Sequence, residues 1–359
     1  MRNDFIKIDG SFLEGGGQIL RTSLALSFIF QKPCLIYNIR ANREKPGLQV
    51  QHLLGVQALS KLCGGILEGD YLNSQEIKFY PGNQIQESIS LTIDTAASIT
   101  LILQMLILSI LFSKINLQNK VPNDIKITFN GGATNTFFSP TMKYFEMVFL
   151  KSLKKVIDPE IEIDFNILRH GFYPKGEAQL IMNIKPLNIF RKKSLILKER
   201  GELKNIYIFS GASKDLQKRK VAERQVSGIR NILRSILKLP LRINISYEDT
   251  SSTGSFVCIV AEFENSIVGV DKLGKIQKSA EEIGKEAVLE FLEEIKSEAC
   301  FDKYNGDQIL PYIAITKKRA IFTVSQITNH LKTNTWVIEK FLNGKFKIKK
   351  NVIYWESIS

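Results

Sequence analysis

The sequence of 359 residues contains few residues of the kinds that bind metals or form disulfides, with four cysteines and three histidines. Cys34, Cys63, Cys258 and Cys300 are widely spaced, and no C-x-x-C pair occurs. This pattern indicates neither a zinc ribbon nor a disulfide framework, and it fits a reducing compartment. The first residues also reach a strand-like segment too early for a secretory signal, so we expect a cytoplasmic protein.

Long uncharged segments are also scarce. One segment, from Thr95 to Ser113, continues for 19 residues without a charged side chain. Ser98, Thr100, Gln104 and Ser109 interrupt its apolar character. A membrane span is the alternative, but a helix buried against a sheet is the better interpretation of one interrupted segment. We therefore expect no membrane association.

Several common signatures of nucleotide binding and hydrolysis are missing. The P-loop pattern G-x-x-x-x-G-K-[ST] does not occur, and Gly15-Gly16-Gly17 lacks the spacing of a dinucleotide fingerprint. No G-x-S-x-G elbow occurs either. If the protein binds a nucleotide, it does so by another arrangement of residues.

Acidic residues are outnumbered, with 36 Asp and Glu against 49 Lys and Arg, which gives a net charge of +13. This excess favours polyanionic partners such as nucleic acid. Much of it lies between Arg191 and Lys238, where fourteen basic side chains stand against four acidic ones. A solvated helix face and a surface that faces nucleic acid are both compatible with this cluster.

Strand-like and helix-like segments follow one another in a repeated order. Residues 1–186 contain the pattern βαβαββ twice, and residues 276–359 contain a third, diverged copy. We therefore predict an α+β fold of three repeated units, each a four-stranded sheet with two helices. The three units form the main domain, and residues 187–275 form a small, basic, inserted α/β domain.

The most informative motif is Glu14-Gly15-Gly16-Gly17-Gln18-Ile19-Leu20-Arg21. Glycines let backbone N–H groups approach a ligand closely, and the N-terminus of a following helix favours anions. A carboxylate just before the loop suggests that a metal ion accompanies the anion. A glycine-rich turn without a ligand is the alternative.

Two further arginines follow the next predicted strand. Because strand ends in one sheet converge, Arg40 and Arg43 could share a site with Arg21 and Glu14. Guanidinium groups bind phosphate through a forked pair of donors, so this cluster suggests a phosphate site. A solvated loop is the alternative for Arg40 and Arg43.

Histidine is the residue most often used for proton transfer near neutral pH. On sequence alone His52, His170 and His330 are each more often structural than catalytic. His330 has the most suggestive setting, because its neighbours are polar and it lies between the end of a predicted strand and a helix predicted from Asn334 to Leu342.

Four motifs in order resemble those of the RNA 3′-terminal phosphate cyclases: Glu14–Arg21, Ile39–Leu48, Asp307–Pro311 and His330–Asn334. The resemblance extends from about Ile8 to Ile353. It implies ATP-dependent conversion of an RNA 3′-phosphate into a 2′,3′-cyclic phosphodiester. It further implies a covalent histidine–AMP intermediate, which by motif match forms on His330, and then an RNA-(3′)pp(5′)A intermediate.

The resemblance also implies roles for individual residues. Glu14 matches a ligand of a divalent cation, Mg²⁺ or Mn²⁺, and Tyr304 matches an aromatic residue that stacks on adenine. Arg21, Arg40 and Arg43 match arginines that hold the ATP phosphates and the RNA end. The same pocket is implied to include Gln51, Gln104, Gly131, Asp307 and Gln308.

The sequence departs from the family pattern in three places. Asp94 and Ala97 stand where glycines are usual, the turn Pro174–Ala178 replaces a run of glycines, and the residues before His330 differ. Alternatives to an active cyclase are a non-catalytic relative in ribosomal-RNA processing, an enolpyruvyl transferase and an RNA-binding protein without turnover. The retained glycine loop and His330 favour the active cyclase. The biological RNA and the oligomeric state stay open, with a dimer as one alternative.

Overall fold

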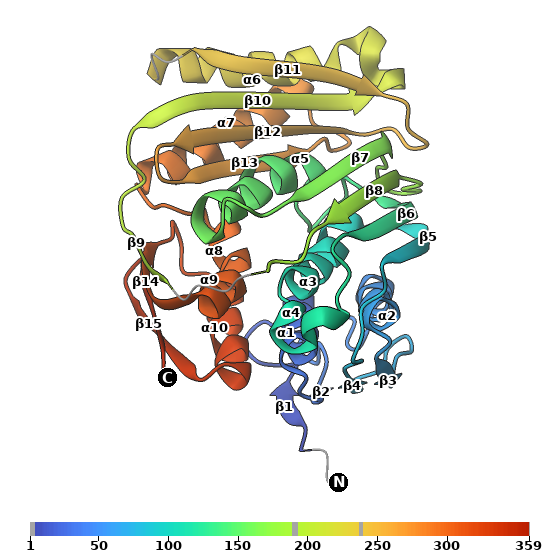
Figure 1. The fold of residues 1–359 in the computed structure, drawn as a ribbon. Helices are drawn as coiled ribbons and strands as arrows, with labels where there is room; N and C mark the ends of the chain where they lie inside the picture. The colour runs from blue at the N-terminus through green and yellow to red at the C-terminus, as the bar shows by residue number, and fades with distance from the viewer. Residues whose placement is uncertain (1–3, 189–192, 237–239, 359) are drawn as a thin grey trace.

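In the part of the chain that the structure describes, four sheets of four strands each form the framework (Figure 1). The computed structural model describes residues 4–188, 193–236 and 240–358. In three of the sheets the first two strands of a unit pair in parallel and the remaining pairings are antiparallel. The predicted α+β fold of repeated units with a small insertion is therefore confirmed.

The first two units follow each other directly along the chain. The first has the sheet order β1-β2-β4-β3 and the second the matching order β5-β6-β8-β7. The elements of the first unit are β1 (Ile6–Asp9), α1 (Gly17–Phe30), β2 (Cys34–Tyr37), α2 (Val50–Cys63), β3 (Ile66–Glu68) and β4 (Ile77–Tyr80). Those of the second are β5 (Ser88–Ser98), α3 (Ile99–Leu111), α4 (Lys114–Leu117), η1 (Gln118–Lys120), β6 (Ile125–Ala133), α5 (Met142–Tyr144), η2 (Phe145–Leu150), η3 (Leu153–Ile157), β7 (Ile163–Arg169) and β8 (Gln179–Ile184).

The third unit is interrupted in sequence but complete in space. Its first strand, β9 (Lys193–Leu197), pairs in parallel with β14 (Lys317–Thr323), far along the chain. The sheet order β15-β16-β14-β9 is that of the other units read from the opposite edge. The remaining elements are α8 (Asn305–Gln308), α9 (Leu310–Thr316), α10 (Asn329–Phe341), β15 (Gly344–Lys349) and β16 (Val352–Ser357).

The fourth sheet, ordered β11-β10-β12-β13, belongs to the inserted segment. Its elements are β10 (Leu203–Ser213), η4 (Lys214–Arg219), α6 (Val221–Ile236), β11 (Leu241–Glu248), β12 (Ser255–Phe263), β13 (Ile267–Leu273) and α7 (Ala280–Lys296). A separate hydrophobic core joins this sheet to α6 and α7, and it includes Ile208, Ile259, Ile229, Val288 and Phe291.

We propose from this packing that the inserted domain runs from 203 to 296. The sequence-based boundaries, 187 and 275, separate β9 from the sheet it belongs to and α7 from the core it completes. β9 is a strand of five residues next to a basic stretch, so its pattern is weak. The amphipathic pattern of α7 predicts a helix but carries no information about which sheet the helix covers.

Basic residues of the inserted domain lie on more than one helix. Lys218 and Arg219 belong to the short 3₁₀ helix η4, and Lys220 ends it with a positive φ of 51°. Arg224 forms a forked ion pair with Glu281 of α7, with distances of 2.7 and 2.8 Å. Part of the expected positive charge is therefore neutralised within the domain.

The apolar segment of the second unit is a core helix. Ile99–Leu117 is long and apolar enough to cross a membrane by length and composition, with a mean hydropathy of 1.8. However, 72% of that stretch is buried inside the protein, where α3 contacts α1 and α2. The prediction of a buried helix for this segment is confirmed.

Candidate active site

The N-termini of two helices from different units meet at the candidate site. Helix α1 begins after the glycine loop at Gly17, and α10 begins at Asn329. Thr22 of α1 donates a hydrogen bond to Asn334 of α10 (2.8 Å), and Asn334 donates to the carbonyl of Asp307 (2.8 Å). Because helix N-termini carry partial positive charge, this junction favours a bound anion.

His330 lies in the first turn of α10. We expected it in a loop before a helix that starts near Asn334, but Thr328 caps the helix earlier by accepting a hydrogen bond from the Leu331 amide (3.0 Å). The imidazole Nδ1 is hydrogen-bonded to Gln18 Oε1, and Nε2 lies 3.2 Å from Glu14 Oε2. Because threonine is a common N-cap residue, Thr328 could have indicated from the sequence that the helix starts at Asn329.

Charges around His330 act on its pKa in both directions. Burial lowers the pKa of His330; Glu14 raises it, and the positive charges of Arg21 and Arg43 lower it further. The net direction is downward, which favours the neutral imidazole. Arg43 also contacts Glu14 Oε2, at 3.3 Å, so the carboxylate lies between the histidine and the arginine.

The glycine loop lets these side chains approach the backbone. A Cβ on Gly17 would lie 2.3 Å from Nε2 of His52, and one on Gly16 would lie 3.4 Å from Cε1 of His330. Gly15 has a φ of +57°, which L-residues rarely adopt. Glycine is therefore required at Gly15 for its conformation and at Gly17 for its contact with His52, whereas a Cβ on Gly16 would meet His330 at an ordinary van der Waals distance.

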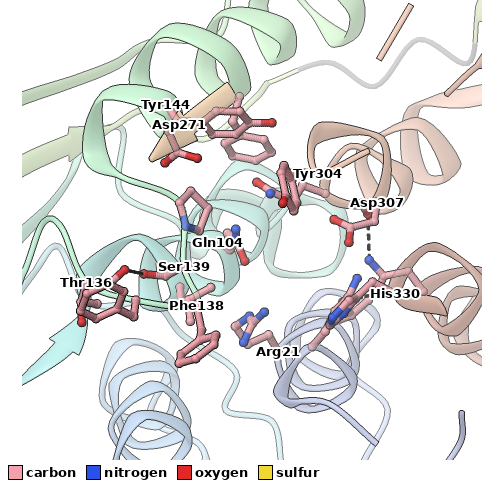
Figure 2. A pocket seen from close by; sticks show the side chains of 18 of the residues that line it. Arg21, Gln104, Thr136, Phe138, Ser139, Tyr144, Asp271, Tyr304, Asp307 and His330 are labelled. Atoms are coloured by element: carbon pink, nitrogen blue, oxygen red, sulfur yellow. Dashed lines mark hydrogen bonds between the residues drawn. The ribbon is translucent and has the colours of Figure 1, made fainter. Parts of the chain in front are cut away.

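A cavity of about 460 Å³ opens between the three units and the inserted domain. His330 and Arg21 lie on one side of it and Tyr304 with Asp271 on another (Figure 2). The predicted site residues that line it are Arg21, Gln104, Tyr304, Asp307, Gln308 and His330. The fold thus brings together residues from α1, α3, α8 and α10 that are far apart in the sequence.

Among the described residues, five other predicted site residues lie outside the lining of this cavity. Glu14 and Arg43 contact each other beside His330, and the other three are Arg40, Gln51 and Gly131. Gln51 binds the backbone of Ser98 through both ends of its amide, and Arg40 donates to the carbonyl of Lys45 (3.0 Å). At Gly131 (φ +99°) a Cβ would lie 2.0 Å from the Ile93 carbonyl oxygen, so strand packing accounts for this glycine. Roles for these three residues in ligand binding stay predictions.

Burial shifts the pKa of titratable residues in the cavity and next to it. It raises the pKa of Asp307 to about 8, against the opposing effect of Arg21, and lowers the pKa of Arg21 to about 10. Burial, together with Arg40 and Arg21, lowers the pKa of His52 to about 3. His52 is therefore neutral at pH 7, whereas Asp307 can hold a proton there.

The inserted domain supplies site residues that the sequence analysis missed. Asp271, Lys272 and Lys275 line the cavity from β13 and the loop after it. Asp271 accepts a hydrogen bond from the Thr141 amide (2.6 Å), which joins the inserted domain to the second unit. The sequence analysis did not predict strand β13. It therefore gave no indication that these charged residues lie close to residues more than a hundred positions earlier in the chain.

A divalent cation at this site would have one protein carboxylate close to the nucleophile. Among residues 4–188, 193–236 and 240–358, no group of three or more His, Cys, Asp or Glu side chains is placed to hold a metal ion. Mg²⁺ commonly takes one or two carboxylates together with substrate phosphates and water. Glu14 fits that kind of shared site and does not form a closed protein site.

The comparison with known proteins identifies the family. The family model for RNA 3′-terminal phosphate cyclase matches residues 12–348. Proteins named RNA 3′-terminal phosphate cyclase from Pyrococcus furiosus and Sulfolobus acidocaldarius are 40% and 39% identical to the chain. These alignments cover 97% and 96% of the chain, and 96% and 97% of the relatives. A relative of the same name from Archaeoglobus fulgidus is 36% identical, over 97% of the chain and 99% of that protein. The chain belongs to the RNA 3′-terminal phosphate cyclase family, which is a family of enzymes.

Proposed function

We propose that the protein uses ATP to convert the 3′-terminal phosphate of RNA into a 2′,3′-cyclic phosphodiester, with His330 as the nucleophile. The observation that carries the proposal is the position of His330 at the junction of two helix N-termini. It lines a cavity with Arg21 and contacts Glu14, which pairs with Arg43. This arrangement supplies a nucleophile and cationic groups for a phosphate at one point.

In the first step the Nε2 atom of His330 attacks the α-phosphorus of ATP. The hydrogen bond to Gln18 Oε1 keeps the imidazole proton on Nδ1, so the lone pair is on Nε2. A P–N bond forms, the bond to the bridging oxygen breaks, and pyrophosphate leaves. The lowered pKa of His330 supports this step, because only the neutral ring is nucleophilic.

In the second step an oxygen of the RNA 3′-phosphate attacks the adenylyl phosphorus. The P–N bond breaks, the imidazole is restored and RNA-(3′)pp(5′)A forms. In the third step the vicinal 2′-hydroxyl attacks the 3′-phosphorus, AMP leaves, and the restored Nε2 accepts the hydroxyl proton. Arg21 and Arg43 can stabilise the negative charge on the phosphoryl oxygens through charge-assisted hydrogen bonds.

A divalent cation, Mg²⁺ or Mn²⁺, would be held by Glu14 together with phosphate oxygens. When bound, such an ion polarises the phosphoryl oxygens that it contacts. Glu14 Oε2 lies next to Arg43 and to the Nε2 atom of His330, so a cation held by Glu14 would lie beside the nucleophile. Tyr304 and Gln104, which line the cavity, are proposed to contact the nucleotide base.

The proposal is tested with ATP labelled on its α-phosphate and a short RNA that ends in a 3′-phosphate. We expect a labelled protein, a cyclic RNA end, and complete loss of labelling in His330→Ala. His170→Ala is the matched control, because its imidazole bonds Thr134 (3.0 Å) and is outside the residues that line the cavity. Labelling that persists in His330→Ala would refute the assignment of the nucleophile.

A non-catalytic role in RNA processing is the second candidate. It requires no ATP labelling by the wild-type protein, although RNA binding would be retained. The arrangement of Glu14, Arg43 and His330 favours the enzyme, because these residues contact each other instead of being dispersed on the surface.

A further inference from the structure

Three aromatic side chains are exposed near the mouth of the cavity. Phe138 is fully exposed, with a relative accessible surface of 103%, and Phe137 and Tyr173 are 42% and 58% exposed. Phe137 and Tyr173 contact edge to face, with ring centroids 6.1 Å apart. We call these three residues the aromatic rim. Large apolar side chains grouped on a surface commonly mark a binding site.

The backbone holds the ring of Phe138 in this exposed position. Phe138 has a φ of +61°, a left-handed conformation that is costly for a bulky residue. The turn around it is closed by Ser139 Oγ, which donates to the carbonyl of the buried Thr136 (2.9 Å; Figure 2). On its C-terminal side, Thr141 is bonded to the inserted domain through Asp271 (2.6 Å). The exposure of Phe138 is therefore built into a fixed loop.

The aromatic rim is continuous with the candidate active site. Phe137 and Phe138 line the same cavity as Arg21 and His330, and Phe138, Arg21 and His330 are labelled in Figure 2. The cation Lys275 lines the cavity too, from the loop after β13. An exposed aromatic surface with cations, next to a phosphate site, matches the way single-stranded nucleic acid is bound: bases stack on rings and phosphates contact cations.

We propose that the aromatic rim, chiefly Phe138, is a stacking platform for nucleobases at the 3′ end of single-stranded RNA. The proposal rests on the proposed function, because it assumes that the RNA phosphate reaches His330. The rim places a base at the mouth while the phosphate lies deeper, near Arg21. Stacking accepts every base, so the rim adds affinity for single strands without selecting a sequence.

The test measures RNA binding in the absence of ATP, by fluorescence anisotropy of a short labelled RNA with a 3′-phosphate. Phe138→Ala is expected to weaken binding by roughly fivefold or more, and Phe138→Trp to restore it. Ile196→Ala is the control, because Ile196 is also highly exposed (74%) but is outside the residues that line the cavity. We expect wild-type affinity for this control.

A second RNA that lacks the last bases but keeps the phosphates completes a double-mutant cycle. Removing the bases should weaken binding to the wild type and have little further effect on Phe138→Ala, because that variant has no ring on which the bases can stack. Equal effects of base removal on both proteins would overturn the proposal, as would wild-type affinity in Phe138→Ala.

Labelling by ATP alone separates the rim from the nucleotide site. The decrease in RNA affinity in Phe138→Ala should exceed any decrease in ATP labelling at least about fivefold. Equal decreases in RNA affinity and in ATP labelling would show that the Phe138 ring contacts ATP, and this result would overturn the proposal. If ATP does not label the wild-type protein, the proposed function is refuted. The RNA-binding measurements need no ATP, so they would still show whether the aromatic rim stacks on bases.

Discussion

Replacing Glu294 by glutamine should stabilise the protein near neutral pH. Glu294 lies on α7 of the inserted domain and is 5% exposed. Burial raises the pKa of its carboxyl from 4.5 to about 7, and the neighbouring Asp302 contributes to the increase. The folded protein therefore binds the Glu294 proton more tightly than the unfolded chain does.

The sign and size of the effect follow from that difference. Below pH 4.5 the carboxyl is protonated in both states, and its favourable contribution is fully present. As the pH rises to about 7, the unfolded chain ionises first and the folded state loses stability. The difference between a pKa of 4.5 and one of about 7 corresponds to about 3 kcal/mol at pH 8. The glutamine of Glu294→Gln cannot ionise. The stability of this variant relative to the wild type should therefore increase by that amount as the pH rises from 4.5 to 7.

The assay is urea unfolding of both proteins at several pH values from 4 to 8. The difference in unfolding free energy should rise through this range and level off above pH 7. Glu293→Gln, an exposed neighbour on α7, is the matched control and should differ from wild type by less than about 1 kcal/mol throughout. A difference for Glu294→Gln that stays constant with pH would refute the reasoning.

Three other changes test the site and the inserted domain. Gly17→Ala would place its methyl group 2.3 Å from Nε2 of His52, so ATP labelling should fall at least about tenfold and the melting temperature should drop. Gln18→Leu removes the acceptor for the nucleophilic imidazole, and the labelling rate should fall by roughly threefold to tenfold. Charge reversal at Arg219 and Lys220 should weaken RNA binding and reduce its salt dependence, by about 0.7 in the log–log slope for each phosphate that is no longer neutralised, while ATP labelling continues.

Each of these changes has a control or a contradicting outcome. Gly55→Ala places a methyl group 3.5 Å from the flexible end of Met105 and should be tolerated, unlike Gly17→Ala. Wild-type labelling in Gln18→Leu would show that the amide does not orient the ring. An unchanged affinity and salt slope after charge reversal would identify the η4 surface as merely solvated.

Local patterns in the sequence were sufficient to predict most helices and strands of the three units. The order βαβαββ in residues 1–186 was predicted, and the uncharged segment at 95–113 predicted a buried helix, which the structure shows as α3. Local chemistry also placed the glycine loop, the two arginines after β2 and the histidine that begins α10 as candidates. These features depend on neighbours along the chain, which is why they could be read before folding.

The tertiary structure decided which segments act together. Pairing of β9 with β14 completes the third sheet, and packing of α7 on β12 and β13 completes the inserted domain. Both contacts join segments far apart in sequence, where periodicity carries no information on the partner. The same holds for the site: the sequence by itself determined that a glycine loop, arginines and a polar histidine exist. Only the fold placed His330 against Glu14 and Gln18 and brought Asp271 to the cavity, because long-range packing sets those distances.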